Sequence, residues 1–413
     1  MVDKNLFLYD LAVVAIMKNE GRYLKEWLDY HLLAGVEHFY IYDNESTDNQ
    51  AEVARPYVEA GIVDYIPLPG KAMQFVAYND AVKNFKFQCR YMAFIDADEF
   101  IYPKTNRSLI EVVDEILSQD KNAAGLSIHW QIFGSNGLEK ADYSRGVLER
   151  FTRRAEKNFW KHREDNHQQA LGNVFFKVIA DPRRIKEMQV HHAFYFEDFY
   201  SVNENGLKLQ PNVGCCPVVA EKIVVNHYFS KSKEEFYLKR GRGRSDVALN
   251  WPKIIFDDYD RNEIFDDGIL KYRAARAKNF SFVSDAQRIN RVTETLTKTL
   301  SRYAADEIFD LETALTCLAL STYLRKKTSD NNFKIYEEAS LAAVLKSVEG
   351  ASFVEGQLFI RELPKILRLP YPAVKEVRLV AAQIISQFMD DAKNKSNWTK
   401  FFELDYVRDF LKE

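Results

Sequence analysis

The stretch Tyr91-Met92-Ala93-Phe94-Ile95-Asp96-Ala97-Asp98-Glu99-Phe100 organises the chain, because an apolar run ends there in three acids. Residues Tyr91 to Ile95 predict a buried strand. Side chains two residues apart in an extended segment project to the same side. Asp96 and Asp98 are therefore expected to present two carboxylates to one point, as a hard divalent cation with phosphate ligands requires. The alternative is a strand that runs into a solvated acidic loop.

Apolar runs alternate with helical patterns on both sides of this stretch. Leu11 to Met17, Val36 to Tyr42 and Ile62 to Ile66 predict further buried strands. Helical patterns lie between them and end at Gly35 and Gly61. This alternation predicts an α/β fold, with a mostly parallel sheet covered by helices on both faces.

Polar clusters follow three of the predicted strands. They are Lys18-Asn19-Glu20, Asp43 to Asp48, and Asp96 to Asp98. Ligands of open parallel sheets bind beyond the carboxyl ends of the strands. The three clusters therefore predict one binding site at a shared rim of the sheet.

The amino-acid composition limits the binding partners and the cellular compartment that we expect for this protein. A net charge of −3 gives no polycationic surface, which argues against nucleic acid as a partner. The four cysteines, with Cys215 and Cys216 adjacent, lack the spacing of a disulfide framework or a metal site. The first residues lack the build of a signal peptide, and no run approaches the roughly 20 apolar residues of a membrane span. We expect a cytoplasmic protein, with any membrane association peripheral and at the inner face.

Beyond about Arg273 the sequence pattern changes and predicts helices. Thr293 to Leu324, Tyr336 to Val348 and Tyr371 to Met389 read as helices. We therefore predict two domains, an α/β domain over residues 1–273 and a helical domain over residues 274–413. The helical domain is assigned no chemistry. Its candidate roles are homo-oligomer formation, docking on a membrane-bound partner and holding the acceptor.

Ordered segments between Lys18 and Phe236 carry a resemblance to a known family. They are Lys18-Asn19-Glu20, Tyr23 to Trp27, Gly35 to Asn44, Gln74, Ala77 to Asp80, Phe94 to Phe100, Trp130, Phe133 to Gly137, Glu149-Arg150-Phe151, His191-His192, Asn226-His227-Tyr228 and Lys231 to Phe236. In these segments the chain resembles GT-A-type glycosyltransferases, most closely the family 92 (DUF23-like) and bacterial family 2-like group. Residues 274–413 carry none of the resemblance.

The resemblance implies a GT-A fold and a metal-dependent, inverting glycosyltransferase. Such an enzyme would move a hexose, with galactose the first candidate, from a UDP-sugar to a glycan or lipid-linked acceptor in surface polysaccharide synthesis. Mn²⁺ or Mg²⁺ would neutralise the charge of the departing diphosphate. The alternatives are a metal-dependent nucleotidyltransferase and a non-catalytic nucleotide- or glycan-binding protein.

The metal ligands are assigned by the same resemblance. Asp98 is expected to hold the metal, and Asp96 to contact the ribose, the metal or both. A late histidine is expected to complete the ligand set, with His227 as the first choice and His192 as its rival.

The donor nucleotide is expected to contact residues of the predicted rim and of a basic loop. They are Lys18, Asn19, Glu20, Asp43, Gln74, Asn79, Asp96, Arg242 and Arg244. Two glycines among four basic residues over Lys239 to Arg244 suggest a mobile loop that closes over the diphosphate. The alternatives are a helix cap for Asn19, a turn acid for Asp43 and a solvated helix end for the basic loop.

The sequence does not single out the general base or the residues that contact the acceptor. An inverting transfer needs a carboxylate near the acceptor hydroxyl. The candidate bases are Glu149, Asp198 with its neighbour Glu197, and Asp246. Trp130 and Phe133 are candidate acceptor contacts, since sugar faces stack on aromatic rings; ordinary packing is the alternative.

Overall fold

The computed structural model describes residues 2–161, 171–196, 198–212, 214–215, 217–241, 256–304, 310–348 and 350–394. The chain divides into two compact units. One unit is Tyr9–Asp285, and the other combines the first eight residues with the chain from Ala286 onward. The predicted division after residue 273 stays a prediction about domains, whereas the compact units divide at Asp285.

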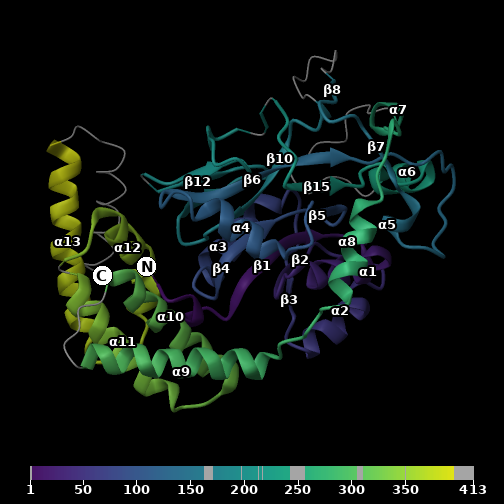
Figure 1. Cartoon of the computed structure of the whole chain (residues 1–413). Helices are drawn as coiled ribbons and strands as arrows, with labels where there is room; N and C mark the ends of the chain where they lie inside the picture. Colours follow the sequence, from purple (N-terminus) through teal and green to yellow (C-terminus); the bar gives the residue numbers. More distant parts are fainter. Residues whose placement is uncertain are drawn as a thin grey trace. The chain divides into compact units, whose positions relative to one another are not determined.

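A mixed ten-stranded sheet forms the centre of the Tyr9–Asp285 unit (Figure 1). Its strands are β1 (Tyr9–Met17), β2 (His38–Asp43), β3 (Val63–Pro67), β4 (Cys89–Phe94), β5 (Glu99–Pro103), β6 (Ala123–Ile132), β10 (Phe176–Ala180), β13 (Tyr200–Val202), β14 (Lys208–Leu209) and β15 (Ile223–His227). The order is β14-β13-β6-β10-β4-β1-β2-β3, and β15 joins β5 to β6. The sheet therefore has a parallel half, β4-β1-β2-β3, and a mixed half built on β6 and β10.

Helices and short ribbons surround this sheet. The helices are α1 (Gly21–Ala34), α2 (Gln50–Glu59), α3 (Gln74–Phe85), α4 (Leu109–Leu117), α5 (Val147–Arg150), α6 (Lys233–Gly241), α7 (Phe256–Tyr259) and α8 (Gly268–Ala277). The two-stranded ribbons are β7 (Arg153–Arg154) with β16 (Ile264–Phe265), β8 (Trp160–Lys161) with β9 (Leu171–Gly172), and β11 (Ile185–Met188) with β12 (Ala193–Tyr195). Mostly parallel strands flanked by helices confirm the predicted fold class.

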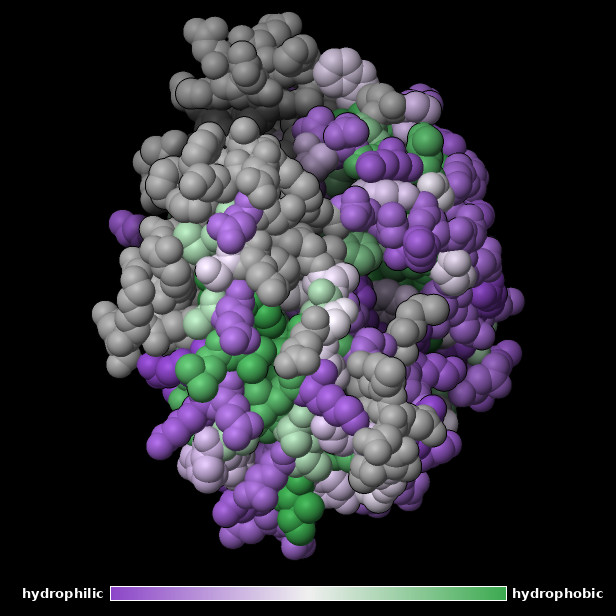
Figure 2. All heavy atoms as spheres, turned by 90° about the vertical axis from the view of Figure 1, so that its left-hand side faces the viewer, coloured by the Kyte–Doolittle hydropathy of each residue, from purple (hydrophilic) through white to green (hydrophobic). Residues whose placement is uncertain are grey.

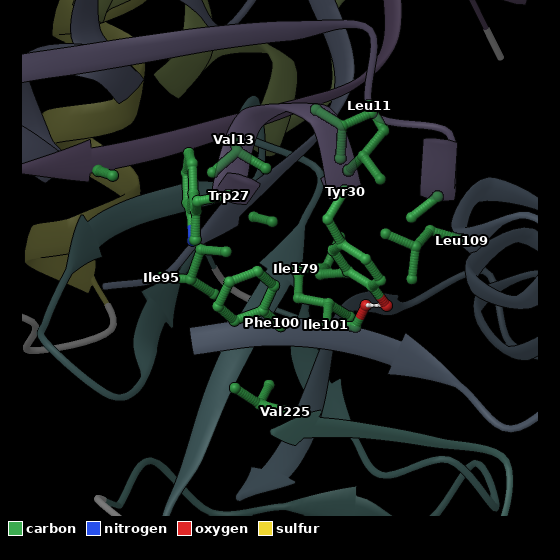
Figure 3. Close-up of a cluster of buried hydrophobic side chains, with 14 of the residues drawn as sticks. Leu11, Val13, Trp27, Tyr30, Ile95, Phe100, Ile101, Leu109, Ile179 and Val225 are labelled. Carbon is green, nitrogen blue, oxygen red and sulfur yellow. Dashed lines mark hydrogen bonds between the residues drawn. The ribbon is translucent and has the colours of Figure 1, made fainter. Parts of the chain in front are cut away.

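The apolar runs form buried strands because helices cover both faces of the parallel half. All but one of the nine residues of β1 are buried, as its near-continuous apolar sequence predicts. Leu11 and Val13 join the core that contains α1, together with Ile95 and Phe100 from either side of the acidic turn (Figure 3). The acidic turn is thus anchored in the core at both of its ends.

Helix α1 fixes strand β5 through polar atoms inside this core. Trp27 Nε1 donates to the carbonyl oxygen of Glu99 at 2.8 Å. Tyr30 Oη donates to the carbonyl oxygen of Ile101, also at 2.8 Å (Figure 3). His31 Nε2 accepts from the backbone N–H of Ile101, and its Nδ1 faces the carbonyl oxygen of Trp27. Because buried polar groups are costly without partners, these bonds set the position of β5 against α1.

The second unit is helical and includes the start of the chain. Its elements are the short 3-10 helix η1 (Lys4–Leu6), α9 (Asp285–Ala304), α10 (Leu311–Thr328), α11 (Phe333–Val348), α12 (Phe353–Ile366) and α13 (Val374–Asn394). Arg291 of α9 donates to the carbonyl oxygens of Phe7 and Leu8 at 2.8 and 3.1 Å. The helical C-terminal region is therefore confirmed, and residues near the start of the chain complete it.

Some hydrophobic side chains reach the surface of the molecule. Ile335 of α11 and Leu379 of α13 are 71% and 68% exposed. Figure 2 shows one face, where hydrophobic side chains gather in a strip between hydrophilic ones. None of the helices in the described ranges is long and apolar enough to cross a membrane.

His31 predicts a specific loss of stability in acid. Burial lowers the pKa of His31 to about 3, below its ordinary value of 6.5. A lowered pKa means that the fold binds the neutral ring, so its contribution is complete above pH 6.5 and is lost as the pH falls toward 3. We expect the unfolding free energy, measured by urea titration, to fall over this range by up to about 1.4 kcal/mol per pH unit from this group.

His31→Gln is the matched variant for this measurement, because its amide can donate and accept but does not titrate in this range. The variant should be less stable than the wild type near neutral pH, and the difference should shrink as the pH falls. Parallel pH profiles for the two proteins would contradict the assignment.

Candidate active site

The acidic turn lies at the carboxyl end of β4, between β4 and β5. The carboxylate of Glu99 accepts from the backbone N–H of Asp96 at 2.8 Å, and the N–H of Glu99 donates to the carbonyl oxygen of Asp96 at 3.1 Å. These two bonds close a tight turn around Ala97. The parallel neighbours β1 and β2 end at Met17 and Asp43, which are paired in register. The predicted rim is therefore formed by adjacent strands.

The carboxylate of Asp96 is held by three side chains. Lys177 Nζ lies 2.9 Å from its Oδ2, Gln74 Nε2 donates to its Oδ1 at 2.7 Å, and Tyr78 Oη donates to the same oxygen at 3.3 Å. Lys177 lies on β10, and Gln74 and Tyr78 lie on α3. The Asp96 side chain is still 32% exposed. It is therefore fixed in direction and retains surface for a ligand.

Lys177 also faces the second buried acid of the turn. Its side chain is 1% exposed, and its Nζ lies 3.7 Å from Glu99 Oε2. Burial raises the pKa of Glu99 to about 8, while Lys177 opposes the rise. The Lys177 ammonium thus lies against two acids of the turn, and Asp96 is the nearer of them.

Asp98 faces cationic and imidazole groups instead. Its Oδ2 contacts the ammonium of Lys239 on α6 and lies 3.5 Å from His227 Nε2 at the end of β15. Lys239, His227 and the buried Lys231 hold the pKa of Asp98 well below its ordinary value, although burial opposes them. The Asp98 side chain is 5% exposed. It is thus an ionised carboxylate at the bottom of the site.

His227, which the sequence analysis predicts as a metal ligand, lies beside Asp98. Burial lowers its pKa, which favours the neutral imidazole that a metal needs. Its ring centroid lies 4.4 Å from that of Trp130, and its Nδ1 has no hydrogen-bond partner among the described residues. The rival His192 packs edge-on against Phe194 of β12. His227 is therefore the histidine that the structure brings to the acidic turn.

Helix α6 is fixed by a buried ion pair at its first turn. Glu235 makes a bidentate pair with Arg150 at 2.9 and 3.0 Å, and both side chains are almost fully buried. The same carboxylate accepts from Ser232 at the start of the helix and from Tyr23 Oη. Because residues four apart share a helix face, fixing Glu235 directs Lys239 toward Asp98.

Two residues of the predicted nucleotide rim shape the loops beside it. Asn19 has a left-handed φ of 57°, and its Oδ1 accepts from the N–H groups of Thr47 and Asp48 at 2.6 and 3.2 Å. Asp43 Oδ1 accepts from Ser46 N–H and from Gln50 Nε2 at 3.1 and 3.2 Å. Both side chains thus fold the loop after β2 onto the end of β1.

The other predicted nucleotide contacts differ in their placement. Glu20 is buried at the start of α1, and Lys18 beside it is half-buried. Asn79 uses its amide oxygen and nitrogen on the backbone of Met188, at 2.9 and 2.8 Å, which joins α3 to β11. Arg242 and Arg244 lie outside the described residues.

The structure describes two of the candidate bases, Glu149 and Asp198. Glu149 is exposed on α5 and pairs with Arg273 at 2.8 Å. Asp198 precedes Tyr200, which pairs with Ala123 at the amino end of β6. His227 pairs with Ile132 at the other end of β6, about 30 Å away at roughly 3.3 Å per residue. Asp198 is therefore wrong as the base, because the strand places it far from the acidic turn. Asp246, like Glu197, lies outside the described residues.

The two predicted acceptor contacts also separate. Trp130 is half-buried, and its ring packs between those of His191 and His227 at the site. Phe133 is fully buried and packs against Tyr228. The Phe133 ring has no surface to offer an acceptor in this structure, so packing is its observed role.

Three lysines and one acid of the site were missed in the sequence. They are Lys177, Lys231, Lys239 and Glu99. A lysine within the apolar run Phe175 to Ala180 was the available signal for Lys177, since lysines are seldom fully buried without a partner. Lys239 belongs to the basic run for which the sequence predicts a mobile loop or a solvated helix end, and neither reading places it against Asp98. Which acid each lysine meets depends on strand pairing that spacing does not reveal.

Asp98 and His227 are the residues that could hold a divalent metal ion. Their facing oxygen and nitrogen are 3.5 Å apart, near the roughly 3 Å between adjacent ligands of an octahedral ion. Within the described ranges, no group of three or more His, Cys, Asp or Glu side chains could hold a metal ion. A two-residue donor set fits a cation that takes its other ligands from phosphates and water, as Mg²⁺ commonly does.

Known proteins are similar to part of this chain. A glycosyltransferase family 92 protein of Ricinus communis is 26% identical over 245 residues, which cover 59% of this chain and 39% of that protein. A galactan beta-1,4-galactosyltransferase of Arabidopsis thaliana is 30% identical over 100 residues, 22% of this chain and 19% of its own. The chain thus spans about two fifths of the length of the first of these relatives.

The chain also aligns with a solved structure and matches the sequence model of one protein family. The crystal structure of S. aureus TarS 1-349 in complex with UDP aligns over 97% of this chain and 89% of its own, with a TM-score of 0.29 and 12% identity. The model described as Glycosyltransferase family 92 matches residues 14–236, more than half of the 413. The chain therefore belongs to glycosyltransferase family 92.

Proposed function

We propose that this chain is a metal-dependent, inverting glycosyltransferase. It would transfer a hexose, with galactose the first candidate, from a UDP-sugar to a glycan or lipid-linked acceptor in surface polysaccharide synthesis. The observation that carries the proposal is the convergence of Asp98, His227 and Asp96 at the carboxyl ends of the central strands. Family membership supports the reaction class, and the galactosyltransferase name of one relative supports galactose.

In this proposal the two aspartates have different tasks. Asp96 is held by Lys177, Gln74 and Tyr78, so one side of its carboxylate stays available to accept from ribose hydroxyls. Asp98 is ionised at the bottom of the site, where it suits a cation. In this arrangement Asp96 contacts the nucleoside. Asp98, on the other side of Ala97, holds the cation at the diphosphate.

The metal site in this proposal consists of Asp98 and His227. Mn²⁺ or Mg²⁺ there would act as a Lewis acid toward the charge that develops on the leaving diphosphate. The buried Lys231 near Asp98 adds a fixed positive charge to the same region. A preorganised positive field at the leaving group is the kind of interaction that lowers the barrier to group transfer.

Trp130 remains the proposed acceptor contact, because its half-buried ring lies beside His227. Glu149 and Asp246 remain proposed bases. A base must come within hydrogen-bond reach of the acceptor hydroxyl. The ion pair of Glu149 with Arg273 would then have to open or shift when acceptor binds.

Asp98→Asn tests the proposed metal site, because it removes the charge and keeps the shape. In wild-type protein we expect UDP with Mn²⁺ to raise the melting temperature more than UDP alone, since ligands that bind the folded state stabilise it. The variant should lose this metal-dependent increment. Its turnover of sugar nucleotide should fall by about a hundredfold or more, the scale of losing a charge-stabilising group.

Asp120→Asn is the matched control for this experiment, because Asp120 is an exposed acid near the amino end of β6. It should retain both the increment and the turnover. Unchanged metal-dependent UDP binding in Asp98→Asn would refute the metal assignment. Binding of UDP without turnover of any sugar nucleotide would favour the non-catalytic alternative.

Lys177→Met tests the charge arrangement around Asp96. Removing the Lys177 charge leaves the partly exposed Asp96 carboxylate without its cationic partner, so the unfolding free energy from urea titration should fall by about 1.5–3 kcal/mol. The double variant Asp96→Asn with Lys177→Met should recover part of this loss, because it removes both charges. Equal stability of the single variant and the wild type would show that the pair does not hold the turn.

A further inference from the structure

Lys239 occupies the side of Asp98 that a metal ion would use. Its ammonium contacts Asp98 Oδ2, the same oxygen that faces His227 Nε2. The Asp98 side chain is 5% exposed and that of Lys239 is 25% exposed. The buried carboxylate is therefore neutralised by a side chain that retains access to solvent.

The position of Lys239 follows from the construction of α6. The Arg150–Glu235 pair is buried, with exposed fractions of 1% and 2%, and it fixes the first turn of the helix. Lys239 lies one turn later on the same face. Its four-carbon stem is flexible, and its ammonium lies 5.2 Å from the ring centroid of Phe229. The backbone is thus fixed, while the charged end can move.

A divalent ion bound to Asp98 Oδ2 would lie beside the Lys239 ammonium that contacts the same oxygen. Like charges that share a poorly solvated site repel each other strongly. Lys231 is a further ammonium in this region, buried and with its Nζ 4.5 Å from the ring centroid of Tyr23. A metal ion that arrives alone must therefore separate Lys239 from its carboxylate and repel its ammonium. A metal ion that arrives with a diphosphate brings an anion for the displaced ammonium.

We propose that Lys239 is an exchangeable counter-ion that couples metal binding to nucleotide binding. It pairs with Asp98 in the free protein and moves to the diphosphate of the donor when the metal takes its place. The inference rests on the proposed function. Free metal then binds weakly, and metal and nucleotide each raise the affinity for the other by the same factor, as linkage requires.

The test measures Mn²⁺ binding by the electron paramagnetic resonance signal of free Mn²⁺, with and without UDP. In the wild type, UDP should tighten Mn²⁺ binding at least tenfold. Lys239→Met removes the charge and keeps most of the stem. In this variant, Mn²⁺ without UDP should bind about tenfold more tightly than in the wild type. The factor by which UDP tightens Mn²⁺ binding should fall by about the same amount, within the usual range of coupling between two ligands.

Lys233→Met is the matched control, because Lys233 lies on the same helix and its 42% exposed side chain pairs with Glu139 at 3.4 Å. It should leave both affinities unchanged. Lys239→Gln provides a second uncharged side chain, and circular dichroism checks that each variant is folded. Both uncharged variants should give the same result.

The outcomes separate this inference from the proposed function. Wild-type protein that binds neither Mn²⁺ nor UDP would overturn both. Wild-type protein that binds both ligands, with Lys239→Met and Lys239→Gln showing unchanged Mn²⁺ affinity in the absence of UDP, would overturn the counter-ion role alone. Tighter Mn²⁺ binding by both variants, together with weaker coupling, supports the exchange.

Discussion

The buried ammonium of Lys177 is the charge on which the acidic turn depends. It lies 2.9 Å from Asp96 and 3.7 Å from Glu99 with almost no exposure to solvent. A buried ion pair adds little net stability, but loss of one partner is costly. Strand β10, antiparallel to both β4 and β6, carries this lysine to the turn. The mixed half of the sheet thus neutralises an acid that the parallel half presents.

A second buried pair, between Arg150 and Glu235, connects the other side of the site to the core. It positions α6, and α6 carries the lysine that meets Asp98. The two aspartates are therefore neutralised by lysines from different elements, one held in the sheet and the other at the end of a helix. This asymmetry fits two tasks in a member of glycosyltransferase family 92. A fixed acid suits a nucleoside, and an acid with an exchangeable partner suits a cation.

Much of the fold followed from local patterns. The run Leu11 to Met17 is a strand buried on both faces, as its near-continuous apolar sequence predicts. Asp98 and His227, named through the family resemblance, meet at 3.5 Å. Errors occurred where distant strand pairing decides the position. Asp198 follows β12 in the chain, but the pairing of β13 with β6 places it at the far end of the sheet. Phe133 closely follows the site residue Trp130 in the chain, but its side chain is buried in the core.

The sequence by itself determined the α/β class, the shared rim and the identity of the acids, because these depend on periodicity and on residues close along the chain. The tertiary structure alone decided which cation meets which acid. Lys177 is 81 positions from Asp96, and Lys239 is 141 positions from Asp98. Charge pairing over such separations depends on strand order and helix packing, for which local spacing carries no signal. The same holds for residues 2–8, whose place with the C-terminal helices depends on contacts with Arg291.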